Sequence, residues 1–239
     1  KSDIAGLRAE EQLALIGEKT HELVGLQYST YNRSLLPALK QHGLQIICEH
    51  EELNEAEGAF ADRFFHENVY PVLTPMAVDS SRPFPLIRNK SLNIAALVQK
   101  KDGDEAELEF AMVQVPSVLP RIVELPEGGD GERRVILLEE IIERNMKELF
   151  LNYNIVAAHP FRIMRNADFT LDEEEAEDLL VEIQKKLKKR QWGEVIRLEV
   201  EEKVDRRLLK ILKRELSVGS GDIYEIAGPL DLTFLMKMY

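Results

Sequence analysis

The sequence predicts an α+β fold, in which an N-terminal helical segment precedes a mixed, largely antiparallel sheet with packed helices. Three observations support this class. Apolar residues recur at helical spacing near the N-terminus, alternating apolar segments separated by turns begin at residue 92, and strands and helices then follow in mixed order. With 239 residues, 44% of them hydrophobic, the chain is long enough to bury the core that this fold needs.

Residues 8–41 are predicted to form one long helix that ends at Gly43. Its apolar positions recur at intervals of three, four and seven: Leu13, Ile16, Leu23, Tyr31, Leu35 and Leu39. Pro37 is expected to kink this helix or to open a new turn. An amphipathic helix cannot bury its apolar stripe alone, so we expect it to pack on other helices or on another subunit.

After an apolar run at 44–47, Asn54 and Glu57 have the spacing of a capping box, which predicts a helix that ends near Val69. Strands are predicted at 92–98, 108–115, 121–125, 133–138, 155–165, 194–200 and 223–226. Helices are predicted at 139–150, 171–190 and 205–216. The first two strands should form a hairpin, and Asp231 should cap a short closing helix.

Charge and cysteine content exclude several classes of protein. The formal net charge is −12, which argues against a surface that binds nucleic acid or another long polyanion over a broad area. Any phosphate contact must therefore be local. Cys48 is the single cysteine, so an internal disulfide is excluded. The sequence shows neither a signal-like apolar segment nor an apolar run of about 20 residues, which predicts a cytoplasmic protein without a transmembrane segment.

Three sequence blocks lack the residue pattern of an ordinary helix or strand. The first runs from Val72 through Leu86 to Asn93, and its prolines at 75, 83 and 85 predict a rigid, irregular connector. The second is His159-Pro-Phe-Arg-Ile-Met-Arg-Asn-Ala-Asp168, and the third is Gly228-Pro-Leu-Asp-Leu-Thr233. In order and approximate spacing, these blocks resemble the bacterial polyphosphate kinases, which reversibly transfer the γ-phosphate of ATP to a polyphosphate chain.

The resemblance implies a domain organisation and a set of partners. Residues 1–48 would be the end of the N-terminal helical domain, and residues 49–239 the middle, or head, domain. The parent enzyme would use ATP, Mg²⁺ and inorganic polyphosphate and would form a homodimer or a higher oligomer. Its phosphorylated histidine would lie beyond residue 239. The chain is thus expected to be an excised fragment that lacks catalytic residues and serves scaffold and dimerisation roles, with membrane association of the parent complex left open.

Five basic residues are candidates for phosphate or interdomain contact. Arg162 and Arg165 carry guanidinium groups that match phosphate oxygens, but strand alternation points them to opposite faces unless a bulge intervenes. Pairing with Asp168 or with neighbouring carboxylates is the favoured alternative. Arg82, Arg88 and Lys90 lie on the proline-rich connector, and loops often carry function.

Other constellations favour structural interpretations. His159 does not match the phosphohistidine motif of the family, and it is interpreted as a packed or surface histidine. The other histidines lack metal-ligand spacing, so no metal ligands are predicted. The acidic start and basic end of helix 171–190 suit the helix dipole better than a cation site.

Two alternative functions remain open. The chain could be a stand-alone module that binds a protein partner through helix 8–41. An independent phosphotransferase that uses His159 is disfavoured, because no base, metal or anion-binding loop accompanies that histidine.

Overall fold

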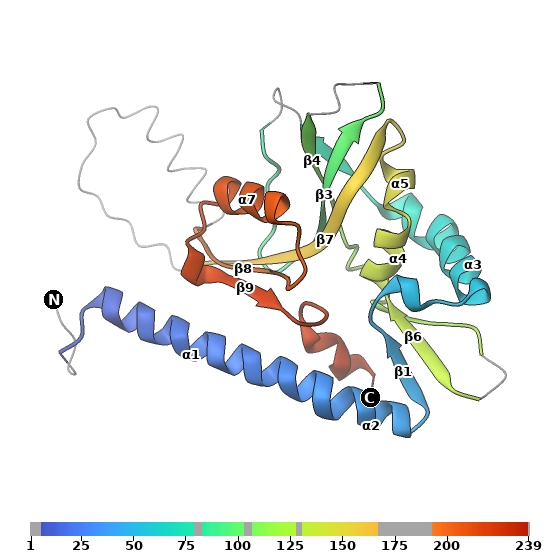
Figure 1. The fold of residues 1–239 in the computed structure, drawn as a ribbon, viewed down its shortest axis with the longest axis horizontal. Helices are drawn as coiled ribbons and strands as arrows, with labels where there is room; N and C mark the ends of the chain where they lie inside the picture. The colour runs from blue at the N-terminus through green and yellow to red at the C-terminus, as the bar shows by residue number, and fades with distance from the viewer. Residues whose placement is uncertain (1–5, 79–82, 103–106, 128–130, 167–192, 239) are drawn as a thin grey trace.

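The structure is a computed structural model that describes residues 6–78, 83–102, 107–127, 131–166 and 193–238. It confirms the α+β class: one long helix, two sheets and several short helices (Figure 1). The predicted helix at 171–190 and its charged halves lie outside the described residues. No helix within the described part of the chain has the length and apolar character needed to cross a bilayer.

The N-terminal helix forms nearly as predicted. Helix α1 (Ala9–Thr30) continues through a π-helical turn (Tyr31–Leu35) into α2 (Leu36–Gln41). Pro37 lies in the first turn of α2, where its missing N–H is tolerated, so the prediction that it opens a new turn is confirmed. Gly43 follows with a φ of 78°, a left-handed conformation that a glycine adopts without strain.

Helix α1 lies along β9 (Ile223–Ile226), the edge strand of the larger sheet (Figure 1). His21 stacks on Tyr224 with ring centroids 3.9 Å apart, and Tyr28 Oη donates a 2.7 Å hydrogen bond to the carbonyl of Pro229. Five other apolar side chains of α1 are 52–69% exposed: Leu13, Leu15, Ile16, Leu23 and Leu26. One face of the helix is therefore packed within the chain, and an apolar set stays uncovered.

The larger sheet has the strand order β2-β4-β3-β7-β8-β9, and all neighbours are antiparallel except the parallel pair β8 and β9. Its other strands are β2 (Met76–Val78), β3 (Leu92–Lys100), β4 (Leu108–Gln114), β7 (Tyr153–Arg165) and β8 (Val195–Glu201). The predicted hairpin is confirmed as β3 and β4. The connector is less irregular than predicted, because its residues Met76–Val78 pair with β4 as an edge strand.

A three-stranded sheet, ordered β1-β6-β5, joins the segment that follows the N-terminal helix to the middle of the chain. Strand β1 (Leu44–Ile47) pairs in parallel with β6 (Arg133–Leu137), which pairs with β5 (Ile122–Glu124) in antiparallel fashion. The domain boundary expected at residue 48 stays a prediction. Strand β1 lies before that boundary yet is hydrogen-bonded to a strand that lies after it.

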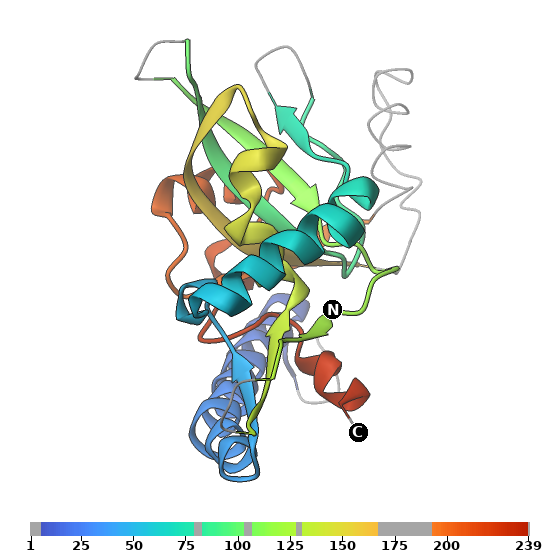
Figure 2. The ribbon, with the colours of Figure 1, turned by 90° about the vertical axis from the view of Figure 1, so that its right-hand side faces the viewer.

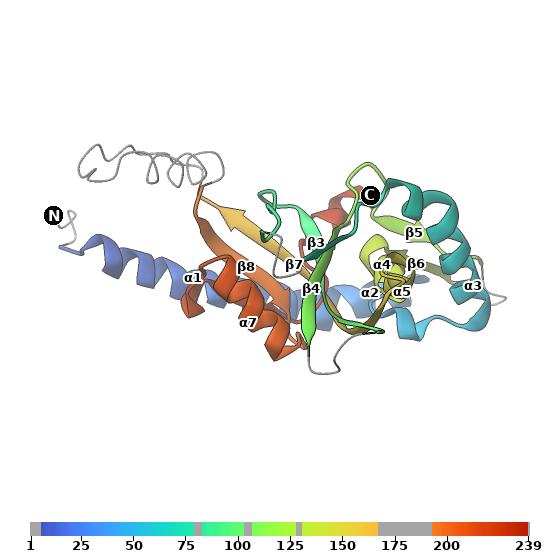
Figure 3. The ribbon, with the colours of Figure 1, turned by 90° about the horizontal axis from the view of Figure 1, so that it is seen from above.

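Short helices cover both faces of the larger sheet (Figures 2 and 3). On one side lie α3 (Glu55–Phe64), which continues in a π-helical turn (Phe65–Val69), α4 (Leu138–Arg144) and α5 (Met146–Leu149). On the other lies α7 (Arg206–Glu215). Ile94, Ala96 and Val98 of β3 pack toward the first group, whereas Ala95 and Leu97 pack toward α7, so this strand is buried on both faces.

Helix boundaries follow the predicted caps. Asn54 accepts from the Glu57 N–H at 2.9 Å, and Glu57 accepts from the Asn54 N–H at 3.0 Å, which is the predicted capping box. Asp231 accepts from the Thr233 N–H at 3.3 Å and begins a 3-10 helix (Leu232–Lys237), which confirms the predicted closing helix in a tighter form.

Candidate functional site

The three unusual sequence blocks meet on strand β7. The Lys90 N–H donates to the Ile163 carbonyl at 2.9 Å, and Arg162 Nε donates to the Lys90 carbonyl at 3.2 Å. Arg162 Nη2 also lies 3.6 Å from Asp231 Oδ2. The connector, the β7 block and the Gly228–Thr233 block are therefore bound to one another through Arg162. We call this meeting point the three-block junction.

Arg162 is held by carboxylates at the centre of the three-block junction. It is 9% exposed, and its Nη1 donates to Glu199 Oε2 at 3.2 Å. Arg197 Nη2 lies 2.6 Å from the other oxygen of Glu199, and its guanidinium lies 4.0 Å above the ring of Tyr224. Buried charges are tolerated when they are paired and hydrogen-bonded, as here. The favoured prediction for Arg162, pairing with a neighbouring carboxylate, is confirmed.

Arg165 fastens the connector to β7 through backbone oxygens. Its Nε and Nη2 donate to the Ile87 carbonyl at 3.1 and 3.0 Å, and its Nη1 donates to Gly193 O at 3.0 Å. Burial lowers the pKa of the Arg165 guanidinium. The β7–β8 register shifts beside Arg165, but the two arginines bind different partners, so the structure does not bring them onto one phosphate-sized target.

The exposed cations of the junction lie on the turn that precedes β3. Arg88 and Lys90 are both exposed, and neither forms an ion pair with a residue that the structure describes. Lys90 has a φ of 60°, which is unusual for a residue other than glycine. Such strain persists where the surroundings fix the backbone, and hydrogen bonds at both the N–H and the carbonyl of Lys90 do so. Arg82, the fifth candidate, and Asp168 lie outside the described residues.

Arg121 is a junction residue that sequence reasoning missed. Its side chain is 16% exposed and pairs with Glu139 of α4, which is 3% exposed. It also donates to the carbonyls of Leu230 and Asp231 and lies 5.0 Å from the centre of the Phe234 ring. The only signal in the sequence was an arginine at the start of a predicted strand. That pattern does not distinguish a buried anchor from a surface charge.

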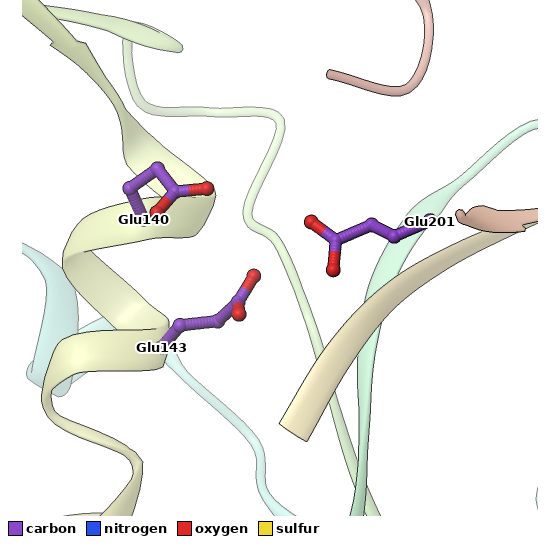
Figure 4. Close-up of side chains that lie close together, drawn as sticks. All are labelled: Glu140, Glu143 and Glu201. Carbon is purple, nitrogen blue, oxygen red and sulfur yellow. The ribbon is translucent and has the colours of Figure 1, made fainter. Parts of the chain in front are cut away.

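A second polar site lies between α4 and the end of β8. Glu140 and Glu143 project from α4 toward Glu201, and one carboxylate oxygen of each of the three residues lies within 4.8 Å of the other two (Figure 4). His50 Nδ1 lies 3.3 Å from Glu140 Oε2, and His159 Nδ1 lies 3.0 Å from Glu201 Oε2. His159 is thus paired and half-buried, in agreement with its structural interpretation. This group of glutamates and histidines could not be predicted from the sequence, because its members come from elements that are far apart in the chain.

The single cysteine has no features of a reactive thiol. Cys48 is half-buried, and burial raises the pKa of its thiol, so the nucleophilic thiolate is disfavoured.

Comparison with known proteins gives one consistent result. The family described as "Polyphosphate kinase middle domain" matches residues 56–238. The polyphosphate kinase of Halalkalibacterium halodurans is 47% identical over 236 residues, which cover 98% of this chain and 33% of that protein. The polyphosphate kinase of Lactiplantibacillus plantarum is 46% identical over 238 residues, which cover 100% of this chain and 32% of that protein. The chain thus spans about a third of the length of these relatives.

The fold is also similar to a solved structure. The crystal structure of polyphosphate kinase from Porphyromonas gingivalis superimposes with a TM-score of 0.75, covering 94% of this chain and 32% of that chain. At 23% sequence identity, this similarity concerns the fold.

Proposed function

This chain belongs to the polyphosphate kinase family and contains its middle domain, and from this premise we propose that it is a non-catalytic part of an ATP-polyphosphate phosphotransferase. The parent protein would reversibly transfer the γ-phosphate of ATP to inorganic polyphosphate. These residues would serve as its scaffold and contribute to its dimer. We also propose a cytoplasmic location and no nucleic-acid partner, in keeping with the net charge of −12.

The observation that carries this proposal is the internal pairing of the three-block junction. Arg162, Arg121 and Arg165 direct their guanidinium groups to carboxylates or carbonyls of the same chain. Phosphoryl transfer needs groups that position the nucleophile and stabilise charge on the transferred phosphoryl. Groups already bound within the protein cannot do this without breaking their pairs. ATP and Mg²⁺ are therefore assigned to the other parts of the parent enzyme.

Arg88 and Lys90 are the exception within the junction, and we assign them the phosphate or interdomain contact. Their side chains are exposed on a turn whose backbone is fixed at Lys90. A rigid turn loses little conformational entropy when it binds a partner. In an intact relative, replacing both corresponding cations by alanine should weaken polyphosphate binding and reduce its salt dependence, whereas replacing the exposed Arg63 by alanine should not.

A test of the proposed role compares the purified chain with an intact relative such as the Halalkalibacterium halodurans enzyme. Polyphosphate formation from ATP and Mg²⁺ should occur with the intact enzyme and be absent with this chain. A rate from the chain comparable with that of the intact enzyme would show that the scaffold assignment is wrong.

The uncovered apolar set of α1 supports the dimerisation role. Leu13, Ile16 and Leu26 are 60–69% exposed, and burying such side chains at an interface contributes about 25 cal/mol per Å². Sedimentation should detect self-association that decreases with Leu13→Ser and Leu26→Ser but not with Gln27→Ser, an exposed polar position on the same helix.

The same apolar set favours the alternative function, a protein-interaction module that uses helix 8–41. A chain that remains monomeric at high concentration, yet binds the remaining domains of an intact relative through α1, would support an intramolecular scaffold rather than a dimer contact. A strictly monomeric chain that binds neither would count against both interpretations.

A further inference from the structure

The polar site between α4 and β8 has a composition that neither scaffold nor dimer role explains. Glu140, Glu143 and Glu201, here called the carboxylate cluster, line a hollow of about 490 Å³ together with His50 and His159. Glu49, Glu51 and Lys203 also line this hollow. Lys203 Nζ is bound to Glu49 Oε1 at 2.9 Å, at the exposed rim. The inner part of the hollow is therefore rich in carboxylates and lacks a bound cationic lysine or arginine among the described residues.

The local fold brings these groups together for simple geometric reasons. Residues three apart on a helix share a face, so Glu140 and Glu143 of α4 both point toward the sheet (Figure 4). Glu201 is the last residue of β8, and its side chain points back at α4 (Figure 4). His159 lies on the neighbouring strand β7, and His50 lies in the 3-10 helix His50–Glu52.

Glu143 supplies a second observation that points to a ligand. Its Oε1 atom is buried and has no hydrogen-bond partner among the described residues, although the side chain points into the cluster (Figure 4). A buried carboxylate oxygen without a partner is destabilising, because its water is removed without replacement. Glu140 is 8% exposed, so a second carboxylate of the cluster is also largely withdrawn from water. Burial, with Glu140 and Glu201 nearby, raises the pKa of Glu143 well above its ordinary value.

Either a shared proton or a bound cation could reduce the repulsion among these carboxylates, and the number of carboxylates favours a cation. One proton can satisfy one carboxylate pair, whereas three carboxylates converge here. Carboxylate oxygens suit Mg²⁺, Ca²⁺ and Mn²⁺, and of these Mg²⁺ demands near-ideal octahedral geometry, which an irregular set of three carboxylates does not supply. The three ligand atoms lie within 4.8 Å of one another, slightly more than the span of about 4.2 Å across an ion that binds oxygen at about 2.1 Å, so a small inward shift of the carboxylates would complete the site.

We propose that the carboxylate cluster of Glu140, Glu143 and Glu201 binds one divalent transition-metal ion of the Mn²⁺ type. The histidines orient the ligands: His50 holds Glu140, and His159 holds Glu201, each through Nδ1. The ion fastens α4 to the end of β8. The proposal rests on the geometry of the carboxylate cluster and does not depend on the proposed function.

The test uses the purified chain, stripped with EDTA and then dialysed. Titration with Mn²⁺ at pH 7.5, followed by the electron paramagnetic resonance of the free ion, should give one bound ion per chain. Glu143→Gln and Glu201→Gln should each weaken binding at least tenfold. Glu10→Gln, at an exposed position of α1, changes the net charge equally and should leave binding unchanged. Mg²⁺ should compete less effectively than Mn²⁺, because it demands stricter geometry and gives up its water reluctantly.

Thermal unfolding provides the second measurement, since ligands that bind only the folded state raise Tm. Mn²⁺ should raise the Tm of the chain and of Glu10→Gln but not that of Glu143→Gln. Circular dichroism shows whether each variant is folded, and Glu201→Gln serves if Glu143→Gln is not. The proposal is overturned if no stoichiometric binding occurs at millimolar Mn²⁺, or if both cluster variants bind as tightly as Glu10→Gln. Either result would mean that the cluster holds a shared proton alone.

Discussion

Replacing Arg162 by methionine tests whether this arginine is a structural centre or a free phosphate ligand. Methionine keeps most of the aliphatic stem and removes the charge. The variant would leave Glu199, whose side chain is 7% exposed, paired with Arg197 alone, and would remove the ion pair of Asp231, whose side chain is 25% exposed. It would also remove the donor to the Lys90 carbonyl.

The expected loss of stability depends on which ion pairs remain after Arg162 is replaced. Breaking a buried ion pair by removing one partner costs about 3–5 kcal/mol. Because Arg197 still lies 2.6 Å from Glu199, the lower end applies, and we expect a loss of about 3 kcal/mol. For a chain of this size, that loss corresponds to a decrease in Tm of roughly 6–12 °C.

Urea and thermal unfolding, followed by far-UV circular dichroism, measure this loss. The matched control is Arg88→Met at an exposed position of the same junction, which should change stability by about 0.5 kcal/mol or less. The double variant of Arg162→Met with Asp231→Asn should recover part of the loss, because Arg197 and Glu199 then remain as a balanced ion pair and no carboxylate of the junction is left in excess. A single variant as stable as the wild type, or a double variant in which the two losses add, would refute the structural role.

Three further predictions concern other parts of the fold. Urea unfolding in cation-free buffer should show that Glu143→Gln stabilises the chain strongly at pH 8 and much less near pH 4.5. The pKa of Glu143 is raised in the folded state, so the wild-type chain loses the stability that protonation of Glu143 confers as pH rises. Asp205→Ala should lower the free energy of unfolding by about 1 kcal/mol at pH 7, because Asp205 caps α7. Ion pairing with Arg207 lowers the Asp205 pKa to about 2, so this difference in stability should vanish as pH falls toward that value, and an unchanged difference at pH 2 would contradict the prediction. Gly193→Ala should lower Tm by several degrees, because Gly193 has a φ of 65° and an added Cβ would lie 2.1 Å from the Asn166 carbonyl oxygen. An unchanged Tm would contradict the backbone conformation described for Gly193.

Local sequence signals predicted most elements, because their causes lie within a few residues. The capping box of Asn54 and Glu57, the glycine stop at Gly43 and the alternation of β3 and β4 each depend on neighbours in the chain. The edge strand at Met76–Val78 was missed for the opposite reason. Its pairing partner is β4, more than 30 residues away, and its three residues show no alternation that would distinguish a strand from an extended connector.

Some residues of the three-block junction could be predicted from the sequence, but their partners could not. Sequence reasoning identified Arg162 and Arg165 and recognised that strand alternation would separate them. It could not assign their partners, since Glu199 is 37 residues from Arg162 and the Ile87 carbonyl is 78 residues from Arg165. Arg121 was missed because its partners, Glu139 and the Leu230 and Asp231 carbonyls, become neighbours only when the sheet has formed.

The junction also explains how three separated blocks can be unusual in sequence without containing a reactive group. Prolines in the connector fix its path, so its carbonyl oxygens reach β7 at set positions. Two of those oxygens, at Ile87 and Lys90, then accept from Arg165 and Arg162, and the carboxylate of Asp231 meets Arg162 from the third block. Each block needs the other two to satisfy its buried polar groups, and a buried polar network specifies one arrangement only when all members are satisfied. Within the described parts of these blocks, docking accounts for Arg162, Arg165 and Asp231, and the exposed Arg88 and Lys90 are the positions to which we assign the proposed phosphate or interdomain contact.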